Sequence, residues 1–366
     1  MARDGGPVDF RQPPGIVRPI DDEHSPRRRP STIIDVANQA GVAIGTVSRY
    51  LNGLPVRAAN RDLIEASIQR LGYRRNALAA AMKSDLTNTI GFMVPSLSDF
   101  HSDVLEKLSQ RMRLTGRAVL AYCHNDDRGS IAEALDFFAA HRVDCLVMDG
   151  HEEAADGVRE LLAGGTPVIL YDNDLPGLPV DRALVENRGA SARAVGHLLD
   201  IGHTRVAVVS GDTRNSAGHE RLEGYFDATR ERGIEPTPDY IIHGNWTESA
   251  GYAAMLRLLS LEHPPTALYC CNYNIAIGAL ALLKEHGLKV PHDISLASFD
   301  DIPLFALHEA GITAVAQPIE KITETIAGFI NSRLSEEGTF HAPQTITLSC
   351  DVILRGSTRR PLGKGS

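Results

Sequence analysis

Three polar side chains within four residues could contact nucleic acid. Thr46, Ser48 and Arg49 bring together two hydroxyl groups and one guanidinium group. A guanidinium can pair with O6 and N7 of guanine, whereas hydroxyl groups bond to phosphate oxygens and fix the register of a protein on the duplex. On an ordinary solvated surface the same residues would have no ligand. The choice between these interpretations depends on the element that carries the three residues.

The surrounding sequence predicts three short helices. Thr32 is a predicted N-cap, with Asp35 placed where a carboxylate meets free N–H groups, and Gly41 ends the first helix. The second helix carries the three polar residues on one face and Val47 on the other, and a third helical pattern ends at Gly72. Two helices joined by a short turn with glycine predict a helix-turn-helix, whose second helix enters the major groove.

The charge of the chain supports this interpretation. The 366 residues have a net charge of −9, but residues 27–84 carry +7, against −2 for residues 1–26 and −14 for residues 85–366. A short basic unit on a long acidic body is typical of a nucleic-acid-binding head. We therefore expect a helix-turn-helix DNA-binding domain over residues 31–74, preceded by a disordered leader over residues 1–30.

Composition places the chain among globular proteins. Apolar residues make up 43% of the sequence, and no apolar stretch approaches the roughly 18 residues that cross a bilayer. The first 20 residues contain no apolar signal core, so a cytoplasmic, nucleoid-associated protein is expected. The odd number of cysteines, five, argues against a disulfide framework.

From residue 89 onward, short β-rich runs alternate with amphipathic helical stretches. This alternation predicts an α/β body with parallel sheets covered by helices, in which ligands bind beyond the carboxyl ends of the strands. The predicted strands are Ile90–Val94, Ala118–Tyr122, Cys145–Met148, Val168–Leu170, Arg205–Val209, Ala267–Cys270 and Ile294–Phe299. The predicted helices are Val104–Leu114, Ile131–Ala140, Ala190–Leu199, Arg221–Arg232, Tyr252–Leu259, Ile275–Glu285 and Ile322–Leu334.

No sequence pattern indicates catalysis. A G-x-G-x-x-G fingerprint and a P-loop are both absent, which removes most support for dinucleotide or nucleoside-triphosphate chemistry. The 14 histidines show no metal-ligand spacing and no Ser-His-Asp arrangement. The sequence therefore predicts no catalytic residue, no metal and no cofactor.

The basic head resembles that of the lactose-repressor and galactose-repressor (LacI/GalR) family of regulators. The motifs that carry this resemblance are Thr32-Ile-Ile-Asp-Val-Ala, Ala40-Gly-Val, Thr46-Val-Ser-Arg, Leu51-Asn-Gly and Leu71-Gly-Tyr. The resemblance implies that Ile44, Gly45 and Arg49 read bases. It also implies that Thr46, Ser48 and Asn52 contact phosphates. Ile44 can offer only apolar contact, for example to a thymine methyl group.

The resemblance also implies a hinge helix and linker over residues 75–88. The alanine-rich stretch Asn76–Lys83 would order when paired with its dimer mate on DNA, and Met82 falls at the position of the family's minor-groove wedge. An ordinary interdomain linker helix is the alternative.

The resemblance continues over residues 89–358. Its motifs there are Leu199-Asp-Ile-Gly-His, Arg221-Leu-Glu-Gly-Tyr, Ser249-Ala-Gly-Tyr, Gly287-Leu-Lys-Val-Pro, Phe299-Asp-Asp-Ile-Pro and Leu354-Arg-Gly-Ser-Thr. It implies a two-lobed, periplasmic-binding-protein-like domain for effector binding and dimerisation, followed by a tail over residues 359–366. Positions matching the family's effector contacts are Asp149, Asp172, Arg221, Trp246, Asn272 and Asp300. Carboxylates that accept bonds from hydroxyls, beside a flat indole, favour a sugar or polyol.

Five positions depart from the family pattern. Ala43 and Arg57 stand where the family usually has serine at helix starts, and Arg75 replaces a common hinge proline. Tyr273 replaces the usual aspartate after the predicted asparagine contact, and Ser102 lies where an aromatic residue often lines the pocket. The identity of the effector therefore cannot be transferred from the family.

The sequence as a whole predicts a DNA-binding transcriptional regulator, most simply a repressor. We expect a homodimer, with a tetramer as a further possibility, on a pseudo-palindromic double-stranded operator, controlled by a sugar-like effector. One alternative is an activator of the same build. Another is a sugar-binding or sugar-modifying protein whose basic head is incidental, and a gel shift would distinguish it.

Overall fold

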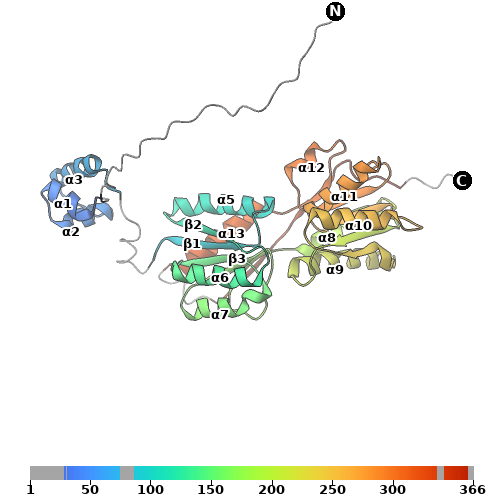
Figure 1. Cartoon of the computed structure of the whole chain (residues 1–366), viewed down its shortest axis with the longest axis horizontal. Helices are drawn as coiled ribbons and strands as arrows, with labels where there is room; N and C mark the ends of the chain where they lie inside the picture. Colours follow the sequence, from blue (N-terminus) through green and yellow to red (C-terminus); the bar gives the residue numbers. More distant parts are fainter. Residues whose placement is uncertain (1–28, 30, 75–85, 336–341, 362–366) are drawn as a thin grey trace, which may run out of the picture. The chain divides into compact units, whose positions relative to one another are not determined.

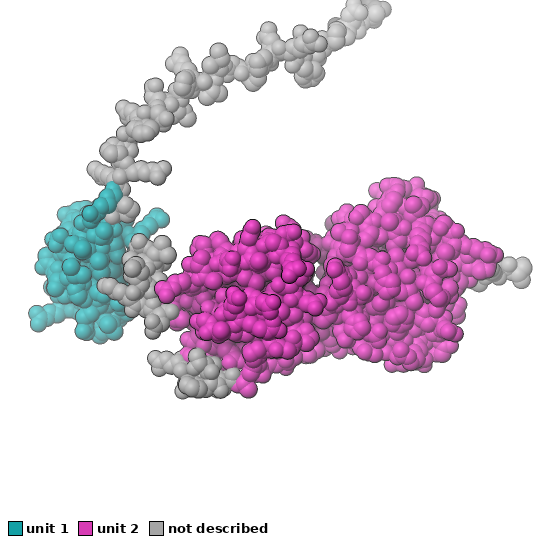
Figure 2. All heavy atoms as spheres, turned by 60° about the horizontal axis from the view of Figure 1, so that its bottom comes forward, with its two compact units in different colours: residues 1–80 teal, residues 81–366 magenta. Residues whose placement is uncertain are grey.

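The computed structural model describes residues 29, 31–74, 86–335 and 342–361. The chain divides into two compact units, residues 1–80 and 81–366, which Figure 2 shows in teal and magenta. Each unit is described by itself below. The hinge helix predicted over residues 75–88, with Met82, and the leader predicted over residues 1–30 lie largely outside the described residues.

The described part of the first unit contains three helices around a small apolar core. The helices are α1 (Ile33–Ala40), α2 (Ile44–Leu51) and α3 (Ala58–Leu71). Thr32 caps α1 in a reciprocal box with Asp35, and Gly41 ends the helix at a φ of 65°. The core consists of Val36, Ala37, Ala40, Val47 and Ile64. The predicted helix-turn-helix is thus present in the structure.

The second unit contains two six-stranded sheets, one in each of two lobes. The first has the order β11-β5-β4-β3-β1-β2 and is parallel throughout. Its strands are β1 (Thr89–Val94), β2 (Ala118–Cys123), β3 (Cys145–Asp149), β4 (Val168–Tyr171), β5 (Asp181–Val185) and β11 (Thr345–Leu348). The second has the order β12-β10-β9-β8-β6-β7 and is parallel except for its edge strand β12. Its strands are β6 (Val206–Ser210), β7 (Ile241–His243), β8 (Ala267–Cys270), β9 (Ser295–Phe299), β10 (Thr313–Ala316) and β12 (Asp351–Ile353).

Helices cover both faces of each sheet. In the first lobe, α5 and α13 lie on one face and α6 and α7 on the other (Figure 1). These helices are α5 (Asp99–Leu114), α6 (Arg128–Ala140), α7 (Ala155–Ala163) and α13 (Ile319–Arg333). In the second lobe, α8 packs against α9 and α10 against α11. The helices of this lobe are α8 (Asn187–Asp200), α9 (Ser216–Glu231), α10 (Glu248–Leu259), α11 (Tyr273–Glu285) and the short α12 (Pro303–Leu307).

The chain passes between the lobes three times. The crossings follow β5, β10 and β11, so each lobe is built from separate stretches of sequence. One hydrophobic cluster includes residues of both lobes, among them Val104 of α5 and Val195 of α8. The expected α/β body with parallel sheets behind a helix-turn-helix head is confirmed.

The start of the first lobe is fixed by one threonine. Thr87 donates its backbone N–H to Asp144 Oδ1 (2.6 Å) and its hydroxyl to the carbonyl oxygen of Arg142 (3.0 Å). Asp144 directly precedes β3 and is buried. The segment that enters β1 is therefore bonded to the amino-terminal edge of the sheet.

Candidate functional site

The second helix of the head presents one exposed face. Successive helical residues turn by about 100°, which places Ile44, Gly45, Ser48, Arg49 and Asn52 on one side of α2. Val47, on the opposite side, is fully buried in the small core. Thr46 lies at the border between the two faces and is half-buried. The predicted base-reading and phosphate-contacting residues therefore lie in α2 or, for Asn52, at its C-cap, and all except Thr46 lie on the outer face.

The amino-terminal turn of this helix is open to a ligand. Ile44 is 45% exposed although it is a large apolar residue. A Cβ atom added to Gly45 would meet nothing within 4 Å, so the backbone there can be approached closely. Arg49 is exposed and makes no salt bridge within the described part of the chain. This combination suits contact with base edges in a groove.

Residues outside the predicted set hold α2 in position. Tyr50 donates its hydroxyl to Glu65 on α3 over 2.8 Å. Ala43 and Arg57 are the N-cap residues of α2 and α3, and neither makes a side-chain capping bond, as expected from the absence of serine at these positions. The pairing of Tyr50 with Glu65 joins residues 15 positions apart and has no local sequence signal.

The six predicted effector residues meet between the two lobes. Asp149, Asp172, Asn272 and Asp300 lie at the carboxyl ends of β3, β4, β8 and β9, as ligand-binding residues do in parallel sheets. The other two are Arg221, within α9, and Trp246, between β7 and α10. This group of six and their immediate neighbours is called the interlobe cleft below.

Arg221 is the centre of the interlobe cleft. Its side chain is only 4% exposed and lies 3.9 Å from Asp172 in the first lobe and 3.8 Å from Asp300 in the second. It donates hydrogen bonds to Asn187 Oδ1 and to the carbonyl oxygen of Cys271, both at 2.8 Å. The guanidinium also lies 3.6 Å above the ring of Phe299. Arg221 thus joins carboxylates of both lobes while most of its surface is desolvated.

Two of the carboxylates sit on unusual backbone. Asp172 has a φ of 61° and Asp300 a φ of 69°, in the left-handed region that non-glycine residues rarely adopt. Aspartate tolerates this region better than most side chains do. Such conformations are retained where the surrounding structure fixes a side chain in place, which is common at ligand sites.

Trp246 and Asn272 form the second-lobe wall. The indole lies directly on Gly211, where an added Cβ would come within 2.3 Å of the ring. Asn272 caps α11 through its side-chain oxygen and donates to the carbonyl oxygen of Trp246 over 3.3 Å. Arg221 lies 5.5 Å from the centroid of the indole.

Burial dominates the electrostatics of the cleft. It raises the pKa of Asp149 well above its ordinary value, and the neighbouring charge of Asp172 raises this pKa further. Burial also raises the pKa of Asp172 and of Asp300, although the Arg221 guanidinium lowers both in part. Burial lowers the pKa of His101 to about 4, so this ring is neutral at neutral pH. The desolvated carboxylates therefore favour a ligand that donates hydrogen bonds or carries positive charge.

Residues that sequence reasoning missed complete the cleft. Asn173 donates its amide to Asp149 Oδ1 (2.8 Å) and accepts the backbone N–H of Ala217 from the other lobe (2.8 Å). Gln317, at the crossing after β10, donates to Asp300 Oδ1 (2.7 Å). These residues come from loops and crossings without a local pattern, so no sequence signal marked them.

Two buried oxygen atoms in the cleft accept no hydrogen bond within the described residues. They are Asp172 Oδ1 and Gln317 Oε1. An unpaired buried acceptor is unfavourable by about 1–3 kcal/mol, and a bound donor removes this penalty.

Tyr273 and Ser102, the two residues of the body that depart from the family pattern, lie in different surroundings. Tyr273 is buried at the start of α11, and its hydroxyl accepts the backbone N–H of Asp99 in the other lobe over 3.2 Å. Ser102 is half-buried in the first turn of α5. Tyr273 therefore spans the cleft where the family's usual aspartate would be too short to do so.

No helix among the described residues is long and apolar enough to cross a membrane. All five cysteines are free thiols, in agreement with the expectation from their odd number.

Comparison with known proteins gives matches over both units. Residues 32–76 match the model of bacterial regulatory proteins of the lacI family, and residues 195–358 match that of periplasmic binding protein-like domains. The chain is 30% identical over 331 residues to the HTH-type transcriptional repressor CytR of Escherichia coli K12, covering 90% of this chain and 96% of the relative.

Two solved structures share this architecture. The transcriptional regulator CelR in complex with cellobiose has a TM-score of 0.68 and 25% identity, covering 89% of this chain and 99% of its own. The lac repressor dimer bound to operator and the anti-inducer ONPF has a TM-score of 0.80 and 23% identity, covering 90% and 100%. At 23% identity, the likeness to the lac repressor shows a shared fold.

Proposed function

The chain belongs to the lacI family of bacterial regulatory proteins, and we propose that it is a sequence-specific transcriptional repressor controlled by a small sugar-like effector. The observation that carries this proposal is the exposed face of α2, where Ile44 and Arg49 project from a helix packed on a small core. The relative CytR, which aligns over nearly its whole length, is a transcriptional repressor.

In the proposed interface, Arg49, Ile44 and Gly45 read base edges. Arg49 pairs with a guanine, and Ile44 contacts an apolar group such as a thymine methyl. Thr46, Ser48 and Asn52 fix the register by binding phosphates. Met82, which lies outside the described residues, would act as the minor-groove wedge of the hinge segment.

The functional form in this proposal is a homodimer on a pseudo-palindromic operator. A two-fold symmetric protein needs two half-sites about one helical turn apart, because both recognition helices enter the same face of the duplex. The lac repressor, which has this fold, is a dimer on its operator.

The effector in this proposal is a sugar or polyol held by Asp149, Asp172, Arg221, Trp246, Asn272 and Asp300. One side-chain oxygen of Asp172 and one of Gln317 accept no hydrogen bond within the described residues, which supports a ligand rich in hydroxyl donors. CelR, a regulator of similar fold, binds cellobiose. Tyr273, whose hydroxyl accepts the backbone N–H of Asp99 in the other lobe, directly follows Asn272 at this site.

Regulation follows from the position of Arg221 and Tyr273 between the lobes. A ligand that bonds to Asp172 and Asp300 changes the contacts that join the lobes, and thereby the relative stability of two lobe arrangements. A coupling of about 1–3 kcal/mol changes operator affinity by roughly 5- to 150-fold.

The same proposal assigns the protein no enzymatic activity and places it in the cytoplasm with the DNA. CytR and CelR are transcriptional regulators. We assign residues 31–74 to DNA binding, residues 75–88 to the hinge and residues 89–358 to effector binding and dimerisation.

Two experiments test the proposal. A gel shift of the full-length protein with genomic fragments at physiological salt should select a small set of fragments that share a pseudo-palindrome. Uniform binding to all fragments by folded protein would refute sequence-specific regulation. In parallel, titration of Trp246, the single tryptophan, with a panel of sugars should change its fluorescence for the true effector class.

A further inference from the structure

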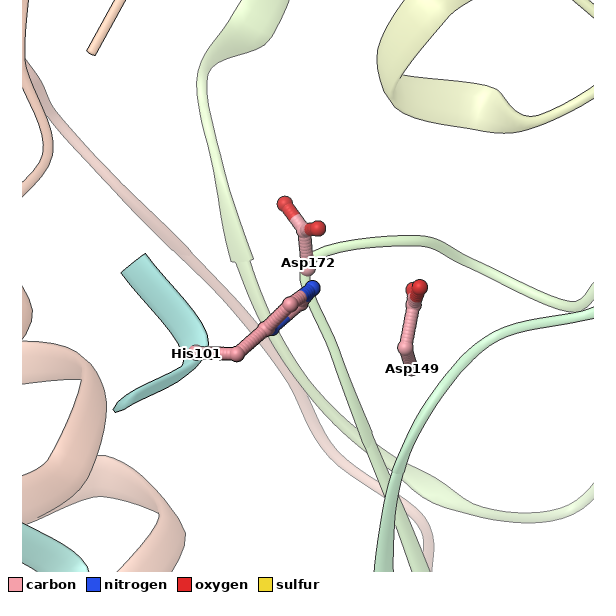
Figure 3. A group of neighbouring side chains, drawn as sticks. All are labelled: His101, Asp149 and Asp172. Atoms are coloured by element: carbon pink, nitrogen blue, oxygen red, sulfur yellow. The ribbon is translucent and has the colours of Figure 1, made fainter. Parts of the chain in front are cut away.

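A histidine and two aspartates converge at the first-lobe side of the interlobe cleft. His101, Asp149 and Asp172 each offer a ligand atom, and these atoms all lie within 4.8 Å of one another. Figure 3 shows a ring nitrogen of His101 pointing toward the space between the two carboxylates. The residues belong to α5, the end of β3 and the end of β4, so three separate elements position them.

His101 is prepared as a nitrogen ligand. It is only 6% exposed, and its Nδ1 is 2.8 Å from the hydroxyl of Tyr171. When Nδ1 carries the ring proton and donates it to this oxygen, Nε2 keeps a lone pair for a metal, which is the usual arrangement of histidines that bind metals.

The two carboxylates are incompletely satisfied. Asp172 Oδ1 is buried and has no hydrogen-bond partner. Asp149 accepts bonds from Asn173 through Oδ1, which orients the carboxylate, and no basic side chain of the described chain lies within salt-bridge distance of it. Arg221, 3.9 Å from Asp172, is already bonded to Asn187 and Cys271. The cluster therefore offers carboxylate oxygens that the neighbouring side chains leave available to a cation.

A polyol only donates hydrogen bonds to these oxygens, whereas a metal ion binds the carboxylates in their ionised form and releases their protons. An imidazole beside two carboxylates is a donor set of divalent transition metals. Zn²⁺ ligand distances of about 2.0–2.2 Å require neighbouring ligand atoms at about 3.0–3.5 Å, so a spacing within 4.8 Å closes by small side-chain rotations.

We propose that His101, Asp149 and Asp172 bind one divalent transition-metal ion, such as Zn²⁺ or Mn²⁺, in the interlobe cleft. Three protein ligands leave coordination positions that water or a hydroxyl of the effector fills. The ion lies beside Arg221, so it adds a second positive centre to the surface that faces the effector. Binding of the ion alone does not depend on the proposed regulatory function.

The test uses full-length protein freed of metal by a chelator and then dialysed. Calorimetric titration with ZnCl₂ and with MnCl₂, each without any sugar, should reveal one site per chain for at least one ion. Asp149→Asn keeps the shape of the side chain but removes its charge, and should weaken that site at least tenfold. His101→Ala should do the same. His141→Ala removes an exposed histidine outside the cluster and should leave the affinity unchanged.

Cobalt provides a second readout. Co²⁺ bound by this site should give a visible d–d absorption band that Asp149→Asn abolishes. If His101→Ala lowers the melting temperature so far that the chain unfolds, Asp172→Asn is a second isosteric variant for the same titration.

Two outcomes would overturn the proposal. One is the absence of stoichiometric binding of either ion. The other is binding of equal strength in the wild type, Asp149→Asn and Asp172→Asn, which would assign the ion to surface histidines. A gel shift of the same metal-free preparations tests operator binding separately, so failure of the metal site is distinguishable from failure of the proposed regulatory function.

Discussion

The two units of the chain differ in how they expose a functional arginine. Arg49 projects from α2 and is exposed, while Arg221 is 4% exposed and joins carboxylates of two lobes. A charge that will meet phosphates or bases can remain in water until the partner arrives. A charge that holds a small ligand must be desolvated in advance, and the fold must supply its counter-charges. The exposed face of the head is formed by one short helix. The cleft is formed by residues that are far apart in the sequence and come together only in the folded chain.

Removal of the buried arginine should have the largest effect. Arg221→Met leaves Asp172 and Asp300 buried without a cation, which is unfavourable by about 3–5 kcal/mol at neutral pH. Urea unfolding followed by circular dichroism measures this loss. Without the guanidinium that lowers them in part, the pKa values of Asp172 and Asp300 rise further, so the carboxylates take up protons more readily as pH falls from 7 to 5 and the deficit should shrink over that range. A deficit independent of pH would show that Arg221 acts through packing alone.

The next effect concerns a buried neutral histidine of the second unit. Burial lowers the pKa of His124 to about 4, below its ordinary value of 6.5, so the unfolded chain binds the proton more readily. The wild type should therefore lose stability as pH falls from 6.5 to 4, by up to about 3 kcal/mol through this group. His124→Asn can still accept the backbone N–H of Asp126 and should lose less over that range. Parallel stability curves for the two proteins would contradict the prediction.

Loss of the exposed arginine should affect DNA and leave folding intact. Arg49→Ala should weaken binding to the true operator by about 1–3 kcal/mol and relax selection at one base pair, with an unchanged melting curve. Arg257→Ala, an exposed position on α10, removes the same charge from the other unit and serves as the control. If both variants bind the operator equally well, Arg49 does not belong to the base-reading set.

The smallest expected effect tests the bond across the cleft. Tyr273→Phe removes only the hydroxyl that accepts the Asp99 N–H, which should lower the stability of the second unit by about 0.5–1.5 kcal/mol. Tyr252→Phe, which removes an exposed bond to Glu285, is a matched control with a smaller expected change. Equal urea midpoints for both variants would show that the hydroxyl of Tyr273 adds nothing to lobe contact.

The sequence predicted the local elements well where periodicity is strong. All seven predicted strands are present, but β5, β7, β10, β11 and β12 were missed. In β5, Asp181 and Arg182 interrupt the apolar pattern. Asp181 is nevertheless buried, since Arg333, 152 positions later, donates to both of its oxygens at 2.6 and 2.8 Å. A buried charge is stable only with its partner, and a partner so distant in sequence leaves no local trace.

The same limit applies to the cleft. Its six predicted residues were found through a family resemblance, and the structure brings them together. His101 was missed because the apolar spacing starts at Val104, whereas α5 begins at Asp99 with a cap from Ser98. His101 becomes a candidate ligand only because it lies beside Asp149 and Asp172. These two aspartates are neighbours because β3 and β4, which they end, pair in parallel.

The bonds of Thr87 have a mechanical consequence. Because its N–H and hydroxyl are tied to Asp144 and Arg142, the stretch leading out of the first lobe is clamped at the sheet edge opposite to the effector. If a bound effector tilts this lobe, the point at which the chain enters β1 moves with the lobe. In a homodimer, the distance between the two entry points would then change, and with it the separation of half-sites that the two heads can reach.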